Sequence, residues 1–102
     1  ALKCWGNNTF NQLGDGTTVQ RTTPTQIDSG TLYQKVSAGD SHTCAITTAG
    51  ALKCWGSGGS GEIGDGANTT RSTPVVVQSG TSYVQISGGN NFTCGITAAG
   101  QL

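Results

Sequence analysis

Short runs in which apolar and polar residues alternate, separated by glycine-rich turns, predict an all-β chain. Four such runs follow one another between positions 32 and 77, and we expect them to form antiparallel strands at residues 33–38, 42–47, 51–55 and 73–77. Residues 48–50 are expected to form the hairpin loop between the second and third strands, with Gly50 at positive φ. A helical period of 3.6 residues does not appear, so we expect no helices.

The whole pattern occurs twice. Residues 1–50 align with residues 51–100 without a gap, about half of the aligned positions are identical, and the hexapeptide Ala1–Gly6 returns as Ala51–Gly56. We therefore predict two repeats, residues 1–50 and residues 51–102. Four short strands per period of about 50 residues are typical of a β-propeller blade.

The boundaries of the sequence repeats differ from the boundaries of the expected blades. Residues 32–77 supply one complete blade, whereas residues 1–27 supply the last two strands of a blade and residues 83–102 the first two strands of another. Two blades cannot close a ring, because propellers contain about four to eight. We expect a homo-oligomer in which terminal strands of neighbouring copies complete each other's blades, or a fragment of a longer ring. Three chains would supply about six blades and four chains about eight.

The composition argues against several classes of binding partner. Lysine and arginine number 5, aspartate and glutamate number 5, and the formal net charge is zero, so no basic surface for nucleic acid is expected. No apolar run approaches the roughly 20 residues that span a bilayer, and we expect no membrane partner. No cofactor is indicated. No signal-like leader precedes the first repeat, so we expect a mature chain, a segment of a longer protein or an engineered chain.

The four cysteines are expected to form disulfides. Counting outward from the hairpin loop places Cys44 opposite Cys54 at a non-hydrogen-bonded position, where the two side chains can bond. The same count places Cys94 opposite a position equivalent to Cys4, so we expect Cys94 to bond Cys4 of the next copy. Such bonds would indicate an extracellular or periplasmic location. The alternative is four reduced, buried cysteines; a zinc site is not indicated, since the chain has one histidine and no closely spaced cysteine pair.

Recurring aromatic residues are interpreted as packing between blades. A tryptophan ends a strand before glycine in each copy, and wedging between blades is preferred over ligand stacking there. The single histidine aligns with a phenylalanine, which favours a packing position over catalysis. The expected inter-blade residues are Trp5, Trp55, Tyr33, Tyr83, His42 and Phe92.

Loop residues divide into structural positions and candidate partner contacts. An aspartate between two glycines precedes an arginine by six residues in both copies, which predicts a turn bridged by the arginine rather than a calcium site. The structural set is Asp15, Arg21, Asp65, Arg71, Gly50 and Gly100. The copies differ most in residues 7–12 and 17–20. From these loops we take Phe10, Asn8 and Gln20 as candidate partner contacts.

Taken in order, these motifs resemble the repeat of the regulator of chromosome condensation family, in its bacterial, cysteine-containing variety. The matching segments are Val36–Gly39, His42–Ile46, Leu52–Gly56, Asn11–Gly16, and Pro24 with Ile27. The second copy departs from this pattern at Phe92 and at Glu62-Ile63. The resemblance implies a β-propeller, typically of seven blades, a number that whole two-blade chains cannot supply. Relatives include an exchange factor for a small GTPase and an inhibitor of β-lactamases.

We therefore expect a non-enzymatic propeller module that self-assembles and serves as a protein-interaction scaffold. Its partners would be further copies of itself and, through the variable loops, another protein. A purely structural or engineered module that only self-associates is the alternative, and a guanine-nucleotide exchange role rests on the resemblance alone. An enzyme is not indicated, because no nucleophile, base and orienting group converge and a glycosidase would have only Glu62 and Asp65.

Overall fold

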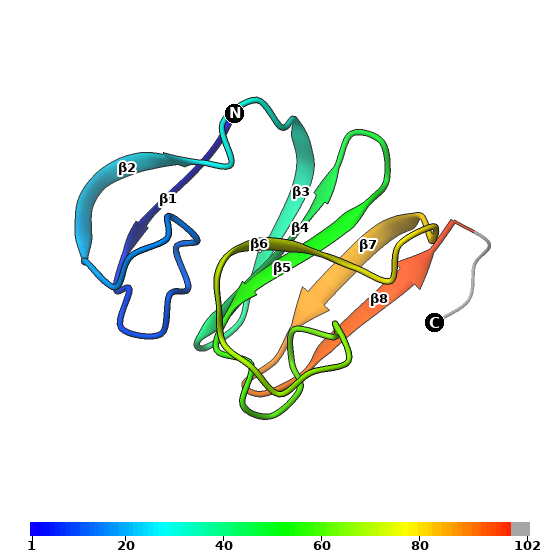
Figure 1. Cartoon of the computed structure of the whole chain (residues 1–102). Helices are drawn as coiled ribbons and strands as arrows, with labels where there is room; N and C mark the ends of the chain where they lie inside the picture. Colours follow the sequence, from blue (N-terminus) through cyan, green and yellow to red (C-terminus); the bar gives the residue numbers. More distant parts are fainter. Residues whose placement is uncertain (99–102) are drawn as a thin grey trace.

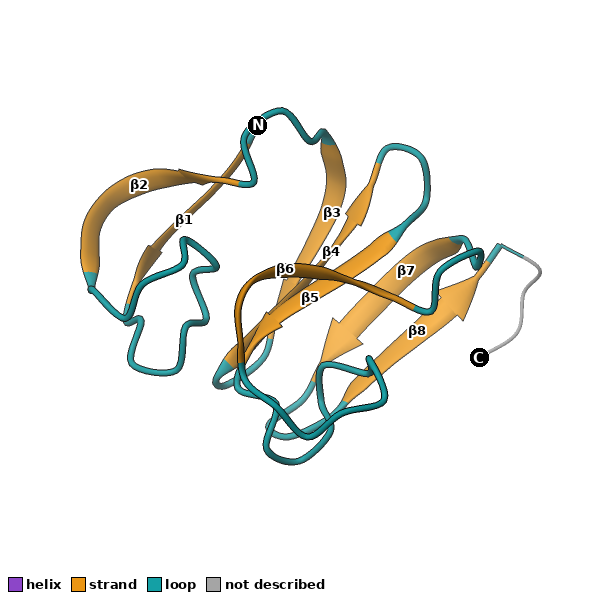
Figure 2. Cartoon of the chain, viewed as in Figure 1, coloured by secondary structure: helices purple, strands orange, loops and turns teal. Residues whose placement is uncertain are grey.

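A computed structural model describes residues 1–98 of the chain, which form eight antiparallel strands in three sheets. The predicted turn residue Gly100 lies outside the described residues. The three sheets stand side by side, each twisted relative to the next, and the segments between strands are loops (Figures 1 and 2). The strands are β1 (Leu2–Gly6), β2 (Arg21–Ile27), β3 (Tyr33–Ala38), β4 (His42–Thr47), β5 (Leu52–Gly56), β6 (Arg71–Val77), β7 (Tyr83–Gly88) and β8 (Thr93–Thr97).

The central sheet contains four strands in chain order, β3-β4-β5-β6, and we call it the complete blade. The two flanking sheets contain two strands each, and we call β1–β2 the N-terminal half-blade and β7–β8 the C-terminal half-blade. The N-terminal half-blade corresponds by sequence to β5–β6, and the C-terminal half-blade corresponds to β3–β4. The chain is therefore a partial β-propeller whose two ends carry different halves of one blade.

Hairpin geometry sets the register of the complete blade. The three-residue loop after β4 closes with Gly50 at φ 90° and with its N–H bonded to the Thr47 carbonyl at 2.9 Å. Counting back from this loop gives Ala45 opposite Lys53 and Cys44 opposite Cys54, and the structure has this register. Because the loop length fixes which residues face each other, a prediction from the sequence alone was sufficient here.

The outermost strand of the blade differs from the prediction. It begins at Arg71 rather than at residue 73, and the strand before it ends at Gly56 rather than at residue 55. Arg71 pairs with Gly56 across a register shift, and its side chain bonds Asp65. This anchoring extends the strand through polar residues that show no apolar alternation. Pro74 lies in β6, at the edge of the sheet, where a missing N–H is tolerated.

Two apolar clusters hold the sheets together, one on each face of β4. The first comprises Cys44, Ile46, Leu52, Cys54, Ile63 and Val77, with Tyr83 and Ile86 of the C-terminal half-blade packed against it. The second comprises Leu2, Ile27, Ala45 and Trp55, with Cys4 and Tyr33 packed against it. Alternate residues of β4 thus face opposite neighbours, and every residue of this strand is buried.

Candidate protein interface

The two half-blades end in open edges that match each other. Among the described residues, β1 pairs only with β2 and β8 pairs only with β7. Their counterparts in the complete blade, β5 and β4, pair directly with each other. The edges of β1 and β8 thus present the two sides of a ladder that the chain forms internally once, and exposed strand edges of this kind are templates for pairing with another chain.

The hydrogen bonds of the complete blade indicate which backbone N–H groups point outward at the open edges of β1 and β8. The Thr47 N–H donates to the Ala51 carbonyl at 2.9 Å, and Cys44 lies 4.1 Å from Cys54 between Cα atoms. Antiparallel pairs alternate between hydrogen-bonded and closer, non-hydrogen-bonded positions, so Ala45 and Lys53 form a hydrogen-bonded pair. By the repeat, the N–H groups of Gly95 and Lys3 point out of the open edges.

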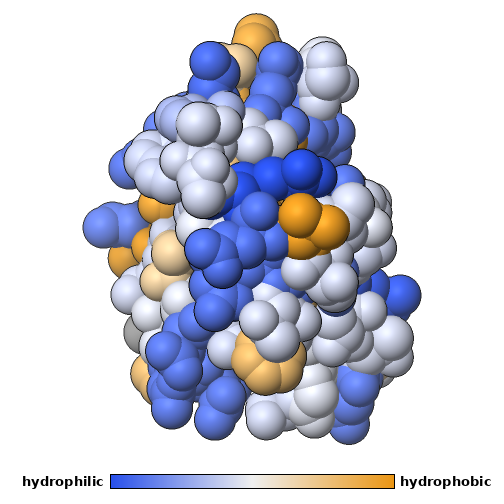
Figure 3. All heavy atoms as spheres, turned by 90° about the vertical axis from the view of Figure 1, so that its left-hand side faces the viewer, coloured by the Kyte–Doolittle hydropathy of each residue, from blue (hydrophilic) through white to orange (hydrophobic). Residues whose placement is uncertain are grey.

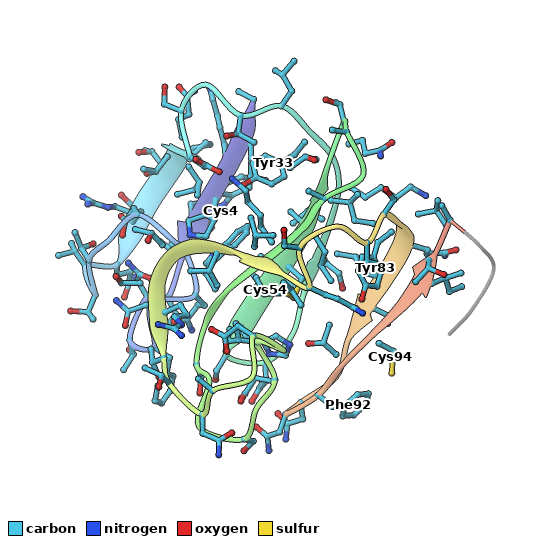
Figure 4. All side chains as sticks on the ribbon, turned by 45° about the vertical axis from the view of Figure 1, so that its right-hand side comes forward. Cys4, Tyr33, Cys54, Tyr83, Phe92 and Cys94 are labelled. Atoms are coloured by element: carbon cyan, nitrogen blue, oxygen red, sulfur yellow. A yellow bond between two sulfur atoms is a disulfide. The ribbon has the colours of Figure 1, made fainter. Side chains whose placement is uncertain are left out.

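The structure places the four cysteines in two situations. Cys44 and Cys54 form a disulfide across β4 and β5. Cys4 and Cys94 are free thiols: Cys4 is half-buried, and burial raises the pKa of its thiol, whereas Cys94 is exposed. Figure 4 shows the Cys94 sulfur pointing away from the rest of the chain, on the opposite side of the molecule from Cys4. Within one chain these two thiols are therefore not brought together.

The two tryptophans differ despite identical flanking residues. Trp55 is fully buried between the complete blade and the N-terminal half-blade, and its ring meets that of Tyr33 edge to face with centroids 6.4 Å apart. Trp5 is 58% exposed, so the inter-blade packing expected for it is not formed within the chain. The reason is topological, because the sheet that Trp5 would pack against is not supplied by residues 1–98 of the same copy.

The tyrosines lie at corresponding places on β3 and β7. The Tyr33 hydroxyl donates to the Asp28 carboxylate at 2.5 Å, and Lys53 binds the same carboxylate oxygen at 3.0 Å. Burial and the hydrogen bond to Asp28 raise the pKa of Tyr33. Tyr83 instead bonds the Gln78 side chain and packs against the first apolar cluster. Both tyrosines thus contact a neighbouring sheet or the linker that leads to it.

His42 and Phe92 also occupy corresponding positions with different outcomes. His42 is buried, and its Nε2 lies 2.8 Å from the Thr93 hydroxyl of the C-terminal half-blade. Burial lowers the pKa of His42, and the charge of Glu62 opposes this shift only in part. Phe92 is 60% exposed, and its ring lies against its own turn at Gly89. Figure 4 shows Phe92 beside the end at which β8 begins.

Asp15 organises the loop between β1 and β2. Its carboxylate accepts hydrogen bonds from the Thr17 N–H at 3.0 Å and the Thr17 hydroxyl at 2.7 Å, and binds the Arg21 Nε at 2.9 Å. Burial raises the pKa of Asp15, but the hydrogen bonds from Thr17 and Arg21 outweigh it and lower the pKa to about 2. Asp65 binds Arg71 in the same way at 2.7 Å. These contacts have the form of the arginine-bridged turn expected from the sequence.

Stability should depend on Asp15 at neutral pH and not at low pH. The folded-state pKa lies below the ordinary value of 3.8, so the stabilisation is complete above about pH 5 and is lost as the pH falls toward 2. Asp15→Asn should lower the free energy of unfolding by about 1–2 kcal/mol at pH 7, and the difference from the unchanged chain should nearly vanish at pH 2. Urea titrations at both pH values measure this, with the exposed Asp40→Asn as control. An equal effect at both pH values would contradict it.

The three candidate partner contacts separate into two exposed residues and one buried residue. Phe10 is 51% exposed and Gln20 is also exposed. Asn8 is 1% exposed, which corrects its assignment as a partner contact. Its side-chain amide donates to the Thr17 and Val19 carbonyls, at 2.7 and 3.1 Å, and its oxygen accepts from the Leu13 N–H at 3.0 Å. Asn8 therefore holds the loop closed.

The surface around this loop is mostly polar. Figure 3 shows the side of the molecule that carries the N-terminal half-blade, where hydrophilic residues cover most of the surface and hydrophobic ones form small patches. Among residues 1–98, no group of three or more histidine, cysteine or acidic side chains is arranged to hold a metal ion. Within the same residues, no helix has the length and apolar character needed to cross a membrane.

Sequence reasoning missed two backbone carbonyls that connect the blades. The Gln12 carbonyl accepts from the Thr43 hydroxyl at 2.8 Å and from the Trp55 indole Nε1 at 2.9 Å. In the second repeat the Glu62 carbonyl accepts from the Thr93 hydroxyl at 2.8 Å. A carbonyl has no residue-specific signal, so only the recurrence of threonine and tryptophan at fixed positions could have indicated these contacts.

The architecture defines the class of protein as a repeat-built β-propeller, of which this chain is a part. The chain belongs to the regulator of chromosome condensation (RCC1) repeat family, whose model matches residues 4–46 and 50–96. A second model of the same repeat matches residues 33–62. The family predicted from the sequence motifs is therefore confirmed.

Three solved structures are similar to this chain. Human WBSCR16 is 22% identical over 93% of the chain, with a TM-score of 0.80. Prp20p from Saccharomyces cerevisiae, described with its binding to Gsp1p and histones, is 18% identical over 91%, with a TM-score of 0.79. Yeast RCC1 (Prp20), solved with Kap60, is 17% identical over 96%, with a TM-score of 0.83. At these identities the likeness shows the fold alone, and the chain spans 26% of the length of each structure.

Proposed function

We propose that the 102-residue chain is a non-enzymatic propeller module that assembles with copies of itself into a closed ring and serves as a protein-interaction scaffold. The carrying observation is that the C-terminal half-blade supplies the first two strands of a blade and the N-terminal half-blade supplies the last two. In the assembly, β8 of one copy pairs with β1 of the next. Cys94 then lies opposite Cys4, as Cys44 lies opposite Cys54 in the complete blade.

The exposure of matched residues supports this arrangement. On β3, Val36 occupies the place that Ile86 occupies on β7. Ile86 packs against the first apolar cluster, which includes Cys44 and Ile46 of β4, whereas Val36 is exposed. A cavity of about 280 Å³ lies between β1 and β3, lined by Leu2, Cys4, Val36 and Ala38 among others. The C-terminal half-blade of a second copy would cover these residues, and covering apolar surface drives association.

The assembled ring would present the polar loops at residues 7–12 and 17–20 once per copy. Phe10 and Gln20 remain the candidate contacts for another protein, because both are exposed and neither lies at an open strand edge. The Cys44–Cys54 disulfide is compatible with an extracellular or periplasmic location. A nucleotide-exchange role has no specific observation in its favour.

Lys3→Pro tests the assembly at one hydrogen bond. The Lys3 N–H points out of the open edge, so proline removes a donor to the neighbouring copy while the pairing of β1 with β2 is kept. We expect sedimentation equilibrium to show the unchanged chain as a multiple of 10.3 kDa and the dissociation constant of Lys3→Pro to rise at least roughly tenfold.

Lys3→Ala is the matched control and should assemble like the unchanged chain, because it keeps the N–H. Assembly of Lys3→Pro with unchanged affinity would show that copies associate through another surface.

A further inference from the structure

Trp55 fills a packing site between the complete blade and the N-terminal half-blade, and we call this site the Trp55 seat. Its indole Nε1 donates to the Gln12 carbonyl at 2.9 Å, and the Thr43 hydroxyl donates to the same oxygen at 2.8 Å. The ring lies directly over Gly14, where an added Cβ would come within 2.6 Å of two indole atoms. Leu2, Ile27 and Ala45 complete the apolar wall. The seat therefore needs a glycine, an accepting carbonyl and a threonine in one place.

The second repeat builds the same seat without a tryptophan from this chain. The Glu62 carbonyl accepts from the Thr93 hydroxyl at 2.8 Å, as the Gln12 carbonyl accepts from Thr43. Gly64 has φ +81° against +80° for Gly14, but Gly64 is exposed and an added Cβ there would first meet Val77 rather than an indole.

A cavity of about 310 Å³ occupies this position of the second repeat. Its lining includes Leu52, Val77 and Gly95, which correspond one by one to the three apolar residues around Trp55, together with Glu62, Gly64 and Thr93. The match of lining residues identifies the cavity as the counterpart of the Trp55 seat.

We propose that Trp5 of a second copy fills this cavity, with its indole ring over Gly64 and its Nε1 donating to the Glu62 carbonyl. The inference rests on the proposed self-assembly, and it identifies one side-chain contact between the copies. Trp5 has the same flanking residues as Trp55, is 58% exposed, and belongs to the half-blade at the far side of the molecule from the cavity, so the two cannot meet within one copy (Figure 1).

Strand register favours a second copy over any other occupant. When β1 pairs with β8 at Cys4 and Cys94, Trp5 falls opposite Thr93, just as Trp55 lies opposite Thr43. The next residue fits as well. Gly56 lies so close to the His42 and Gln12 backbones that an added Cβ would come within 2.8 and 3.2 Å of their Cα atoms, whereas Gly6 has nothing within 4 Å. Both glycines have positive φ, +103° for Gly56 and +112° for Gly6, so they differ only in their surroundings. The open space beside Gly6 is where a neighbour equivalent to the one beside Gly56 would lie.

The indole N–H signals of the two tryptophans test the contact directly. NMR of the ¹⁵N-labelled chain gives one signal for each, which Trp5→Phe assigns. We expect both indole hydrogens to be protected from solvent exchange at concentrations where the chain is assembled. On dilution, Trp5 should lose protection in parallel with the fall in mass, while Trp55 keeps it. Trp5→Ala should raise the dissociation constant roughly thirtyfold or more, as for a central interface tryptophan.

Phe10→Ala is the matched control, because Phe10 is an aromatic residue of similar exposure in the same half-blade and away from the open edge. It should leave the assembly unchanged. If the chain assembles but the Trp5 indole stays in rapid exchange, the contact is wrong and self-assembly stands. If the mass never exceeds that of one chain, the contact and the proposed function both fail.

Discussion

Trp55→Ala should lower the free energy of unfolding by about 3–5 kcal/mol, the cost of deleting a large buried aromatic side chain. Trp55 is fully buried between two sheets, and its indole N–H donates to the Gln12 carbonyl. Its loss would therefore leave a cavity and remove one hydrogen bond from that carbonyl. Because small domains have total stabilities of about 5–15 kcal/mol, the variant should be close to unfolding at room temperature. Urea denaturation followed by circular dichroism measures the effect.

Trp5→Ala provides the comparison at a matched position. At concentrations low enough to keep the chain unassembled, we expect a change within about 0.5 kcal/mol, because the side chain is exposed. Equal destabilisation by the two substitutions would mean that Trp5 is buried within its own chain, contrary to the fold described above.

Treatment of the assembled chain with oxidised glutathione should convert most of it into covalent oligomers on non-reducing gels. A free thiolate attacks the glutathione disulfide and releases one reduced glutathione. The neighbouring thiol then displaces the second glutathione and forms the Cys94–Cys4 bond between copies. In separate chains that exchange with the assembly, Cys94 should react first, because it is exposed there, whereas burial raises the pKa of the Cys4 thiol.

Cys94→Ser should remain entirely at the mass of one chain under the same conditions, since the Cys44–Cys54 disulfide is internal. Covalent oligomers that persist in Cys94→Ser would show that the copies are joined through Cys4 or the internal disulfide, and not through pairing of β1 with β8.

Local pattern was sufficient to predict the fold because its determinants are local. The three-residue loop ending at Gly50 fixes the register of β4 and β5, and alternation along 33–38 and 42–47 marks two strands with the bounds that the structure has. Because the sequence repeats, the strands of the complete blade also predicted the strands of the two half-blades. The start of β6 was not predictable in this way, because Arg71 joins the strand through its bond to Asp65 rather than through an apolar pattern.

Non-local contacts explain the parts of the interface that the sequence could not predict. Asn8 looked like a variable loop residue, yet its amide reaches residues up to 11 positions away and becomes the centre of the loop. Trp5 and Trp55 share their flanking sequence, so only the presence or absence of a neighbouring sheet distinguishes them. The Glu62 carbonyl that completes the open seat belongs to the backbone and has no signature in residue type.

The mass of the unmodified chain in solution, measured by native mass spectrometry over a dilution series, tests strand exchange most directly. We expect one closed species at an integer multiple of 10.3 kDa, with three or four copies giving about six or eight blades, and dissociation only on strong dilution. A well-folded species of 10.3 kDa at every concentration would contradict it.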